Sequence, residues 1–191
     1  MQHPTRGQEP DHSGSKSGPS EGSAGEMLTV FKERAKLFFA EYAQNVLSIV
    51  TQPGVFFAQM PREGGFKDPG AFVAVGAVVN ALMLSLFHQA PFGPIGHLVF
   101  TAVLLLFASF ASLKLAQKLG VAASFEVNFR VVSYCCVTLL LAWLRQLGLI
   151  YVIGTCYLLY EGFSKAYDLP MPKAMALAAV AVLIVSFAAS W

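Results

Sequence analysis

The chain has 191 residues, of which 55% are hydrophobic and only 13% are charged. An average soluble domain carries about 25% charged residues, whereas here the charges lie before residue 70 or at the ends of apolar runs. These features exclude a soluble globular domain and indicate a protein that crosses a membrane several times. The net charge of +2 gives no reason to expect a nucleic-acid partner.

The first 25 residues are rich in Gly, Ser, Pro and charge, and they contain no apolar segment of the kind found in a secretory signal. Such a segment cannot bury enough apolar surface to offset the entropy lost on folding, so residues 1–25 are expected to form a disordered cytoplasmic tail. His3 and His12 lie in this tail, and a solvated pair is a simpler interpretation than a metal site.

An amphipathic helix is predicted over Glu26–Val50. Ser23 and Glu26 have the spacing of a capping box, and apolar residues then recur at three- and four-residue steps. The charges are too frequent for a membrane span, so the helix is expected on the membrane surface or against the bundle. A soluble coiled coil or a docking helix for a partner is the alternative. Its phenylalanines favour lipid or bundle contact, because coiled-coil seams prefer Leu and Ile.

A second, short helix is predicted over Pro53–Met60, because proline suits the first turn of a helix. Asp68 and Pro69 then give a helix start, with a capping side chain before a proline. Residues 26–68 are therefore expected to be juxtamembrane, and residues 69–191 to form the transmembrane domain. The spans are predicted at about 71–88, 95–115, 127–144, 149–165 and 173–190. The fold class is an all-α integral membrane bundle of five helices preceded by an amphipathic interfacial helix.

The third and fourth spans come from one apolar stretch that Arg145 to Gly148 divides. As one helix, residues 131–160 would be about 45 Å long, whereas the hydrocarbon core is about 30 Å thick. Arg145 would also lie near the middle of the membrane, at a cost of roughly 2.5 kcal/mol or more. A turn brings Arg145 and Trp143 to the interface, and Gly148 tolerates the turn backbone. The stretch therefore predicts a transmembrane helical hairpin.

The positions of lysine and arginine predict the orientation, because cytoplasmic loops are enriched in both residues. Of the 13 such residues, seven precede the first span, three lie between the second and third, and two between the fourth and fifth. Only Arg145 would then lie outside. This predicts a cytoplasmic amino terminus and an external carboxyl terminus. A single helix through Arg145 would put Lys165 and Lys173 outside.

The sequence contains no nucleophile–base pattern, phosphate-binding glycine loop or metal-ligand spacing. We therefore predict that the protein is not an enzyme and has no metal or cofactor. The three cysteines, Cys135, Cys136 and Cys156, lie in predicted spans and are expected to pack as small apolar residues. His88 and His97 flank the outer turn without further ligands nearby, which argues against a two-histidine metal site.

Two acid–base pairs are predicted at the cytoplasmic ends of the hairpin. In each pair the glutamate comes four residues before the basic residue, which is the favourable order in a helix. A proton or ion relay is the functional interpretation, and an interfacial ion pair is the structural one. The hypothesis of a shared polar network adds one amide and one phenol to these pairs: Asn80, Glu126, Arg130, Tyr134, Glu161 and Lys165.

Small residues recur along the fourth and fifth spans and allow membrane helices to approach closely. We expect spans four and five, or spans four and three, to cross tightly on these faces, although alanine and glycine are also simply common in spans. The candidate packing residues are Gly148, Thr155, Gly162, Ala174, Ala178 and Ala181.

Four stretches carry a resemblance to a known family: VLSIVTQPGVFFAQM, SFEVNFRVVSYCCV, YVIGTCYLLYEGFSKAYDLP, and Pro172-Lys173-Ala174. In this order and with five spans, residues 46–190 resemble the Yip-domain family (the Ypt/Rab-interacting protein family), and the chain is similar to its bacterial members. The resemblance implies a cytoplasmic amino-terminal segment, a five-span helical bundle and no known catalytic activity. The similarity to bacterial members implies that the protein lies in a bacterial cytoplasmic membrane. Eukaryotic relatives bind Rab-type GTPases. Their acidic-Leu-Tyr-Gly-Pro signature is not found in this sequence, and Asp68-Pro69-Gly70 is a poor substitute for it, so no functional residue is carried over.

The leading hypothesis is a non-enzymatic multi-pass membrane protein that organises membrane or partner proteins. Its expected partners are the lipid bilayer and either a protein partner or further copies of itself, and no nucleic acid. The alternative is a small transporter or channel subunit with an internal polar path through Asn80, Tyr134 and Glu161. Convergence of these three side chains on a water-accessible cavity would favour the alternative.

Overall fold

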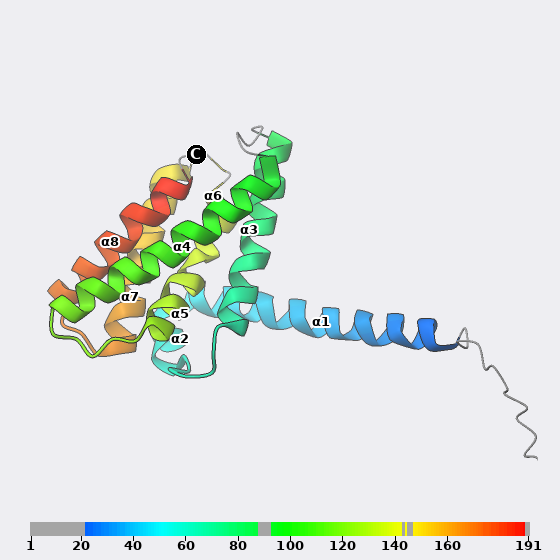
Figure 1. Cartoon of the computed structure of the whole chain (residues 1–191), viewed down its shortest axis with the longest axis horizontal. Helices are drawn as coiled ribbons and strands as arrows, with labels where there is room; N and C mark the ends of the chain where they lie inside the picture. Colours follow the sequence, from blue (N-terminus) through cyan, green and yellow to red (C-terminus); the bar gives the residue numbers. More distant parts are fainter. Residues whose placement is uncertain (1–21, 88–92, 143, 145–146, 190–191) are drawn as a thin grey trace, which may run out of the picture. The chain divides into compact units, whose positions relative to one another are not determined.

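The structure, a computed structural model, describes residues 22–87, 93–142, 144 and 147–189, and only the backbone at 22–24 and 187–189. Within these residues it contains the α-helices α1 to α8 and the short 3-10 helix η1, without a strand (Figure 1). The predicted all-α class is confirmed. The chain divides into two units, Met1–Glu41 and Tyr42–Trp191.

Helix α1 spans Gly22–Thr51. Its residues 22–41 are the described part of the first unit, and its residues 42–51 belong to the second unit. The predicted capping box is wrong, because Ser23 already has helical backbone whereas an N-cap residue does not. Residues 22–25 are thus helical, although they were expected in the disordered tail. The rest of that predicted tail lies outside the described residues.

The next helices follow the proline and glycine signals closely. Helix α2 is Pro53–Gln59, with the proline in its first turn as predicted. Helix α3 is Lys67–Phe87 and begins one residue before the predicted cap. Asp68 therefore does not cap α3 but lies in its first turn, where a negative charge suits the helix dipole. Helix α4 is Gly93–Lys118, and Gly120 follows with a φ of +74°, the left-handed backbone expected of a helix stop.

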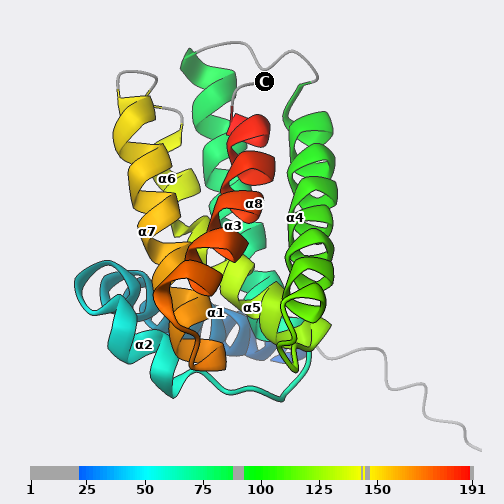
Figure 2. The ribbon, with the colours of Figure 1, turned by 90° about the vertical axis from the view of Figure 1, so that its left-hand side faces the viewer.

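The chain reverses between the two halves of the predicted hairpin. Helix α5 (Phe125–Cys135), η1 (Cys136–Thr138) and α6 (Leu139–Ala142) run one way, and α7 (Gly148–Tyr167) returns beside them (Figure 2). Residues 145 and 146 of the turn lie outside the described part. A single helix through this stretch is excluded, because residues 131 and 138 lie beside residues 162 and 155.

The third predicted span is not one regular helix. The 3-10 helix η1 interrupts it, and the Thr138 hydroxyl donates to the Cys135 carbonyl at 3.0 Å. Such hydrogen bonds from a threonine to its own backbone often accompany a bend in a helix. The sequence pattern of apolar residues does not show this interruption, because both helix types bury similar side chains.

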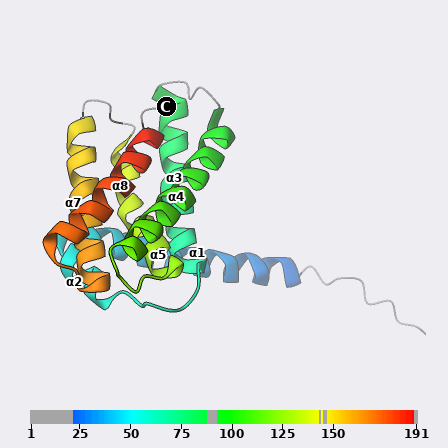
Figure 3. The same ribbon diagram turned by 60° about the vertical axis from the view of Figure 1, so that its left-hand side comes forward.

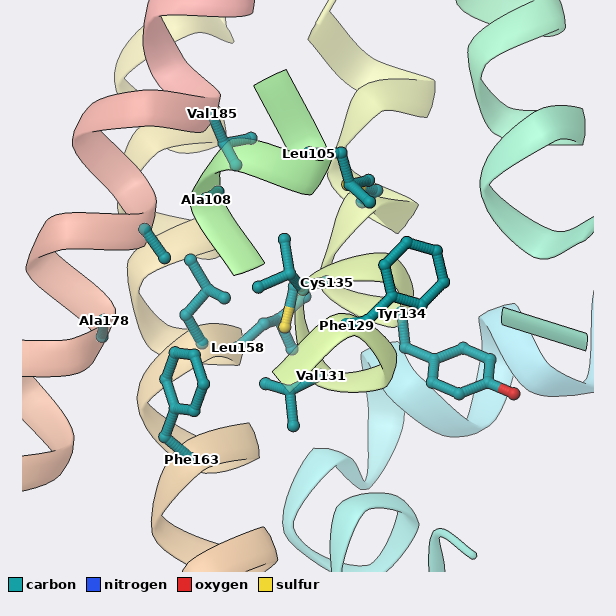
Figure 4. Close-up of a cluster of buried hydrophobic side chains, with 14 of the residues drawn as sticks. Leu105, Ala108, Phe129, Val131, Tyr134, Cys135, Leu158, Phe163, Ala178 and Val185 are labelled. Carbon is teal, nitrogen blue, oxygen red and sulfur yellow. The ribbon is translucent and has the colours of Figure 1, made fainter. Parts of the chain in front are cut away.

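Helix α8, Met171–Ala189, packs between α4 and α7 (Figure 2), while α2 lies beside one end of α7 (Figure 3). The stretch Phe125–Ala142 is the centre of the bundle, since 72% of it is buried against 33% for α3 and for α4. Its side chains meet those of α4, α7 and α8 in the core, where Leu105, Val131, Phe163 and Val185 gather (Figure 4).

Among the residues that the structure describes, three segments are long and apolar enough to cross a membrane: α3, α4 and Phe125–Ala142. Helix α8 is equally apolar over a shorter stretch, Met171–Ser186. Apolar side chains on the outer faces of α3 and α4, such as Leu86 and Val99, are exposed, as expected for surfaces that meet lipid. The chain is therefore a multi-pass helical membrane protein, and the number of five crossings remains a prediction.

Candidate functional site

Buried polar side chains pair between neighbouring helices of the second unit. Asn80 of α3 and His97 of α4 are both buried, with 3.1 Å between Asn80 Nδ2 and His97 Nε2. Since an amide nitrogen only donates, this arrangement makes Nε2 the acceptor. An amide in an apolar span is expected to face another helix and to find a partner there, and Asn80 does so. His97 was expected at the outer turn with His88, which lies outside the described residues.

A second set of buried hydrogen bonds joins three helices, α4, α5 and α7. Asn128 of α5 is fully buried; its Nδ2 donates to Ser112 Oγ of α4 at 3.2 Å, and its Oδ1 accepts from the Tyr167 hydroxyl of α7 at 2.5 Å. Tyr167 lies beyond the predicted span 149–165, and burial raises the pKa of its phenol above the ordinary value. The phenol therefore stays protonated at neutral pH, which is the form that donates to Asn128.

A third contact joins η1 and α7 within the hairpin. The Thr155 hydroxyl donates to Thr138 Oγ1 at 2.8 Å, and both residues are buried. At the amino-terminal end of α8, the Lys173 ammonium donates to the Leu119 carbonyl at 3.0 Å. These contacts leave the central helices connected to one another by side-chain hydrogen bonds as well as by apolar packing.

Arg130 and Glu126 form the ion pair that their spacing predicts. Arg130 Nη2 lies 3.1 Å from Glu126 Oε1, with Arg130 only 3% exposed. The same guanidinium donates to the Gly65 carbonyl at 2.7 Å, and the Gly65 amide donates to Glu126 Oε1 at 2.7 Å. The pair thus fixes the loop before α3 to the start of α5. Gly64 and Gly65 have φ values of +129° and +78°, which suit glycine there.

Glu161 and Lys165 occupy a different place. Both line an open cleft between α2 and α7, together with Gln52 and Tyr157. A Cβ on Gly54 would lie 3.1 Å from Glu161 Oε2 and 3.6 Å from Lys165 Cε, so both side chains lie against the start of α2. No ion pair joins them to each other or to Glu126 and Arg130 in the described part of the chain.

The ring of Tyr134 lies in an aromatic cluster. Its ring centroid is 5.1 Å from that of Phe56 and 5.2 Å from that of Phe72, both in edge-on geometry. Such pairs stabilise a core through packing and ring electrostatics. The cluster connects α2, α3 and α5, and Figure 4 shows the Tyr134 ring pointing away from Val131 and Cys135.

The six candidate polar residues therefore lie in four settings: the Asn80–His97 contact, the Arg130–Glu126 pair, the Tyr134 cluster and the cleft beside α2. Asn80 and Tyr134 do not line the cleft that Glu161 and Lys165 line. Among the described residues, no group of three His, Cys, Asp or Glu side chains is placed to hold a metal ion. Chemically, the arrangement can connect helices and fix the loop before α3.

The candidate packing residues differ among themselves. Gly162 is the closest approach, since a Cβ there would lie 2.6 Å from Val131 Cγ1 and 3.4 Å from Phe57 Cε1. Gly148 is exposed and has no atom within 4 Å of a built Cβ, so its surroundings do not require a glycine. The spacing of the two glycines could not show that only Gly162 needs a small residue. The difference arises because Gly148 lies at the end of α7, away from the neighbouring helices. The remaining candidates are almost fully buried: Thr155, Ala174, Ala178 and Ala181.

Sequence reasoning missed Asn128, Ser112 and Tyr167. The rule that was applied to Asn80, that an amide in an apolar helix must find a partner, applies equally to Asn128. The rule does not name the partner, because Asn128 and Tyr167 are 39 positions apart and meet only through the register of two helices. The contact of Gly65 with Arg130 was missed for the same reason, because the two residues are 65 positions apart in the sequence.

Comparison with known proteins gives one family match. The sequence model of the Yip1 domain matches residues 47–191. Neither the curated proteins nor the solved structures gave a match.

Proposed function

The chain belongs to the Yip1 domain family, and from this premise we propose that it organises membrane or partner proteins without catalysing a reaction. It would act with a protein partner or as an assembly of several copies. The multi-pass helical architecture provides the membrane anchor for such a role.

One observation carries the proposal: several buried polar side chains bind one another across helices. The Asn80–His97, Asn128–Tyr167 and Thr138–Thr155 contacts each join two different helices or segments. In a membrane, such contacts satisfy polar groups that lipid cannot satisfy, and they hold the helices in register. Side chains used in this way serve the bundle rather than a passing solute.

The alternative of a transporter or channel subunit receives less support. A transport path needs polar groups that converge on one water-accessible cavity. Asn80 lies against His97, Tyr134 lies among aromatic rings, and Glu161 lies in an open cleft beside α2. These separate settings favour the organising role.

The proposal is tested by extracting the full chain, with its native lipid, into polymer discs and measuring the mass of the complex. We expect two or more copies, or one copy with a stoichiometric protein partner. Single copies without a partner, together with solute or ion flux in proteoliposomes, would contradict the proposal and support a transport function.

A further inference from the structure

Helix α1 carries an apolar face that no other described residue of its own unit covers. Met27, Leu28, Phe31, Phe38 and Phe39 recur at the steps of one helical face, and their side chains are 39–70% exposed. Phe31 alone is 70% exposed. An isolated amphipathic helix gains most of its stability from covering its apolar face. A surface outside this unit is therefore expected to cover these residues.

The charges of α1 indicate what the cover is. At about 100° per residue, Lys32 and Arg34 lie roughly 80° to either side of the centre of the apolar face, at its two borders. Glu33 lies near the opposite side of the helix. Glu33 also holds the Lys36 ammonium at 2.7 Å, whereas Lys32 and Arg34 form no ion pair within the described residues. The apolar face is thus bordered on both sides by unpaired cations.

This arrangement fits a lipid surface better than another protein helix. Lysine and arginine beside an apolar face extend their stems over it and place their charges among headgroups. A second copy would bring the same cations to the same borders, where they would repel. Helical seams between proteins also prefer Leu and Ile to the phenylalanines found here.

We propose that residues 27–39 of α1 bind the surface of a membrane that contains anionic lipid. The apolar face lies at the boundary of headgroups and acyl chains, and Lys32 and Arg34 contact lipid phosphates. The inference goes beyond the proposed function, because it names a lipid contact that would hold equally in a transporter.

The test places a photoreactive phenylalanine analogue, benzoylphenylalanine, at position 31 of the full chain in proteoliposomes. Leu37 is the matched control position, because it is 71% exposed and lies on the far side of the helix. After irradiation, mass spectrometry identifies the adduct. We expect phospholipid adducts at position 31 and few at position 37. A protein adduct at position 31, or equal lipid adducts at both positions, would overturn the proposal.

The lipid chemistry is tested with vesicles of phosphatidylglycerol mixed with phosphatidylcholine and with vesicles of phosphatidylcholine alone. We expect Lys32→Gln and Arg34→Gln each to lower the adduct yield at position 31 about fivefold in the anionic vesicles. Lys36→Gln is the control and should leave the yield unchanged, because its charge is already paired with Glu33. Equal yields in both vesicle types would contradict the role of anionic lipid.

Discussion

Gly162 is the residue at which α7 comes closest to its neighbours. The space for its missing side chain is taken by Val131 of α5 and Phe57 of α2, both buried. Small residues in membrane helices allow this kind of approach, because apolar attraction between helices is weak in lipid and packing must supply the stability.

Gly162→Ala is expected to lower the free energy of unfolding by about 1–3 kcal/mol through overpacking. Gly162→Leu should lower it further. Thermal unfolding of the purified protein in detergent measures the change. Gly148→Ala is the control and should be neutral or stabilising, since nothing lies within 4 Å of a Cβ there. Unchanged extraction and melting of the leucine variant would contradict the close approach, and Val131→Ala should partly restore Gly162→Ala.

The Arg130–Glu126 ion pair is expected to contribute more to the free energy of unfolding than an ion pair on the surface does. Arg130→Gln leaves Glu126 and the Gly65 carbonyl without their cation and should lower the free energy of unfolding by about 3 kcal/mol. Lys36→Gln breaks an exposed pair, with side chains 72% and 62% exposed, and should change stability by at most about 0.5 kcal/mol. Chemical denaturation of both variants checks this, and equal effects would refute the prediction.

The predicted network between this pair and Glu161 has its own test. In a cysteine-labelling experiment, Arg130→Ala should alter the accessibility of a cysteine at position 161 if the two pairs are linked. Unchanged folding and accessibility would mean that no such network exists.

At the level of single residues, the sequence predicted contacts between residues one helical turn apart, but not contacts between distant positions. Glu126 and Arg130 are one helical turn apart, so their pairing could be read from the sequence. The Gly65 contact could not, because it joins positions 65 residues apart. Gly148, Thr155 and Gly162 recur every seven residues, and only the neighbouring helices distinguish Gly162 from Gly148.

Side-chain hydrogen bonds from Ser112 through Asn128 to Tyr167 connect the helices α4, α5 and α7. Asn128 is fully buried, so its amide has no access to water. A buried polar group without a partner costs considerably more than a hydrogen bond contributes in net terms. These hydrogen bonds therefore favour a single register of the three helices.

Tyr167→Phe removes the donor to Asn128 Oδ1 and is expected to lower the free energy of unfolding by about 1–3 kcal/mol. Tyr157→Phe is the control, because Tyr157 is 53% exposed and should tolerate the change. Melting temperatures of the two variants in the same detergent decide between the outcomes. A Tyr167→Phe variant as stable as Tyr157→Phe would show that the buried contact contributes nothing.

At the level of helices, proline and glycine signals gave starts and stops to within a few residues. Ser124, a residue type that favours N-cap positions, caps α5, since its Oγ accepts from the Val127 amide at 3.2 Å. The start of α1 does not, because helical backbone continues past Ser23 to Gly22. The 3-10 helix η1 could not be predicted, since it depends on the Thr138 hydroxyl binding its own backbone.

The whole molecule combines a helical bundle with a strongly asymmetric distribution of lysine and arginine. The reversal between α6 and α7 separates the third and fourth predicted spans, and with five crossings 12 of the 13 basic residues fall on one side. The Yip1 domain match covers the same bundle. Crossing number and orientation are thus linked, because one crossing fewer would place Lys165 and Lys173 on the outer side.

The most direct test fuses reporters to the two ends of the full chain and determines on which side of the membrane each one is active. One reporter works only in the cytoplasm, and the other works only outside it. We predict a cytoplasmic signal at the amino end and an external signal after Trp191. Both ends on the same side would require an even number of crossings and would contradict the five-span account.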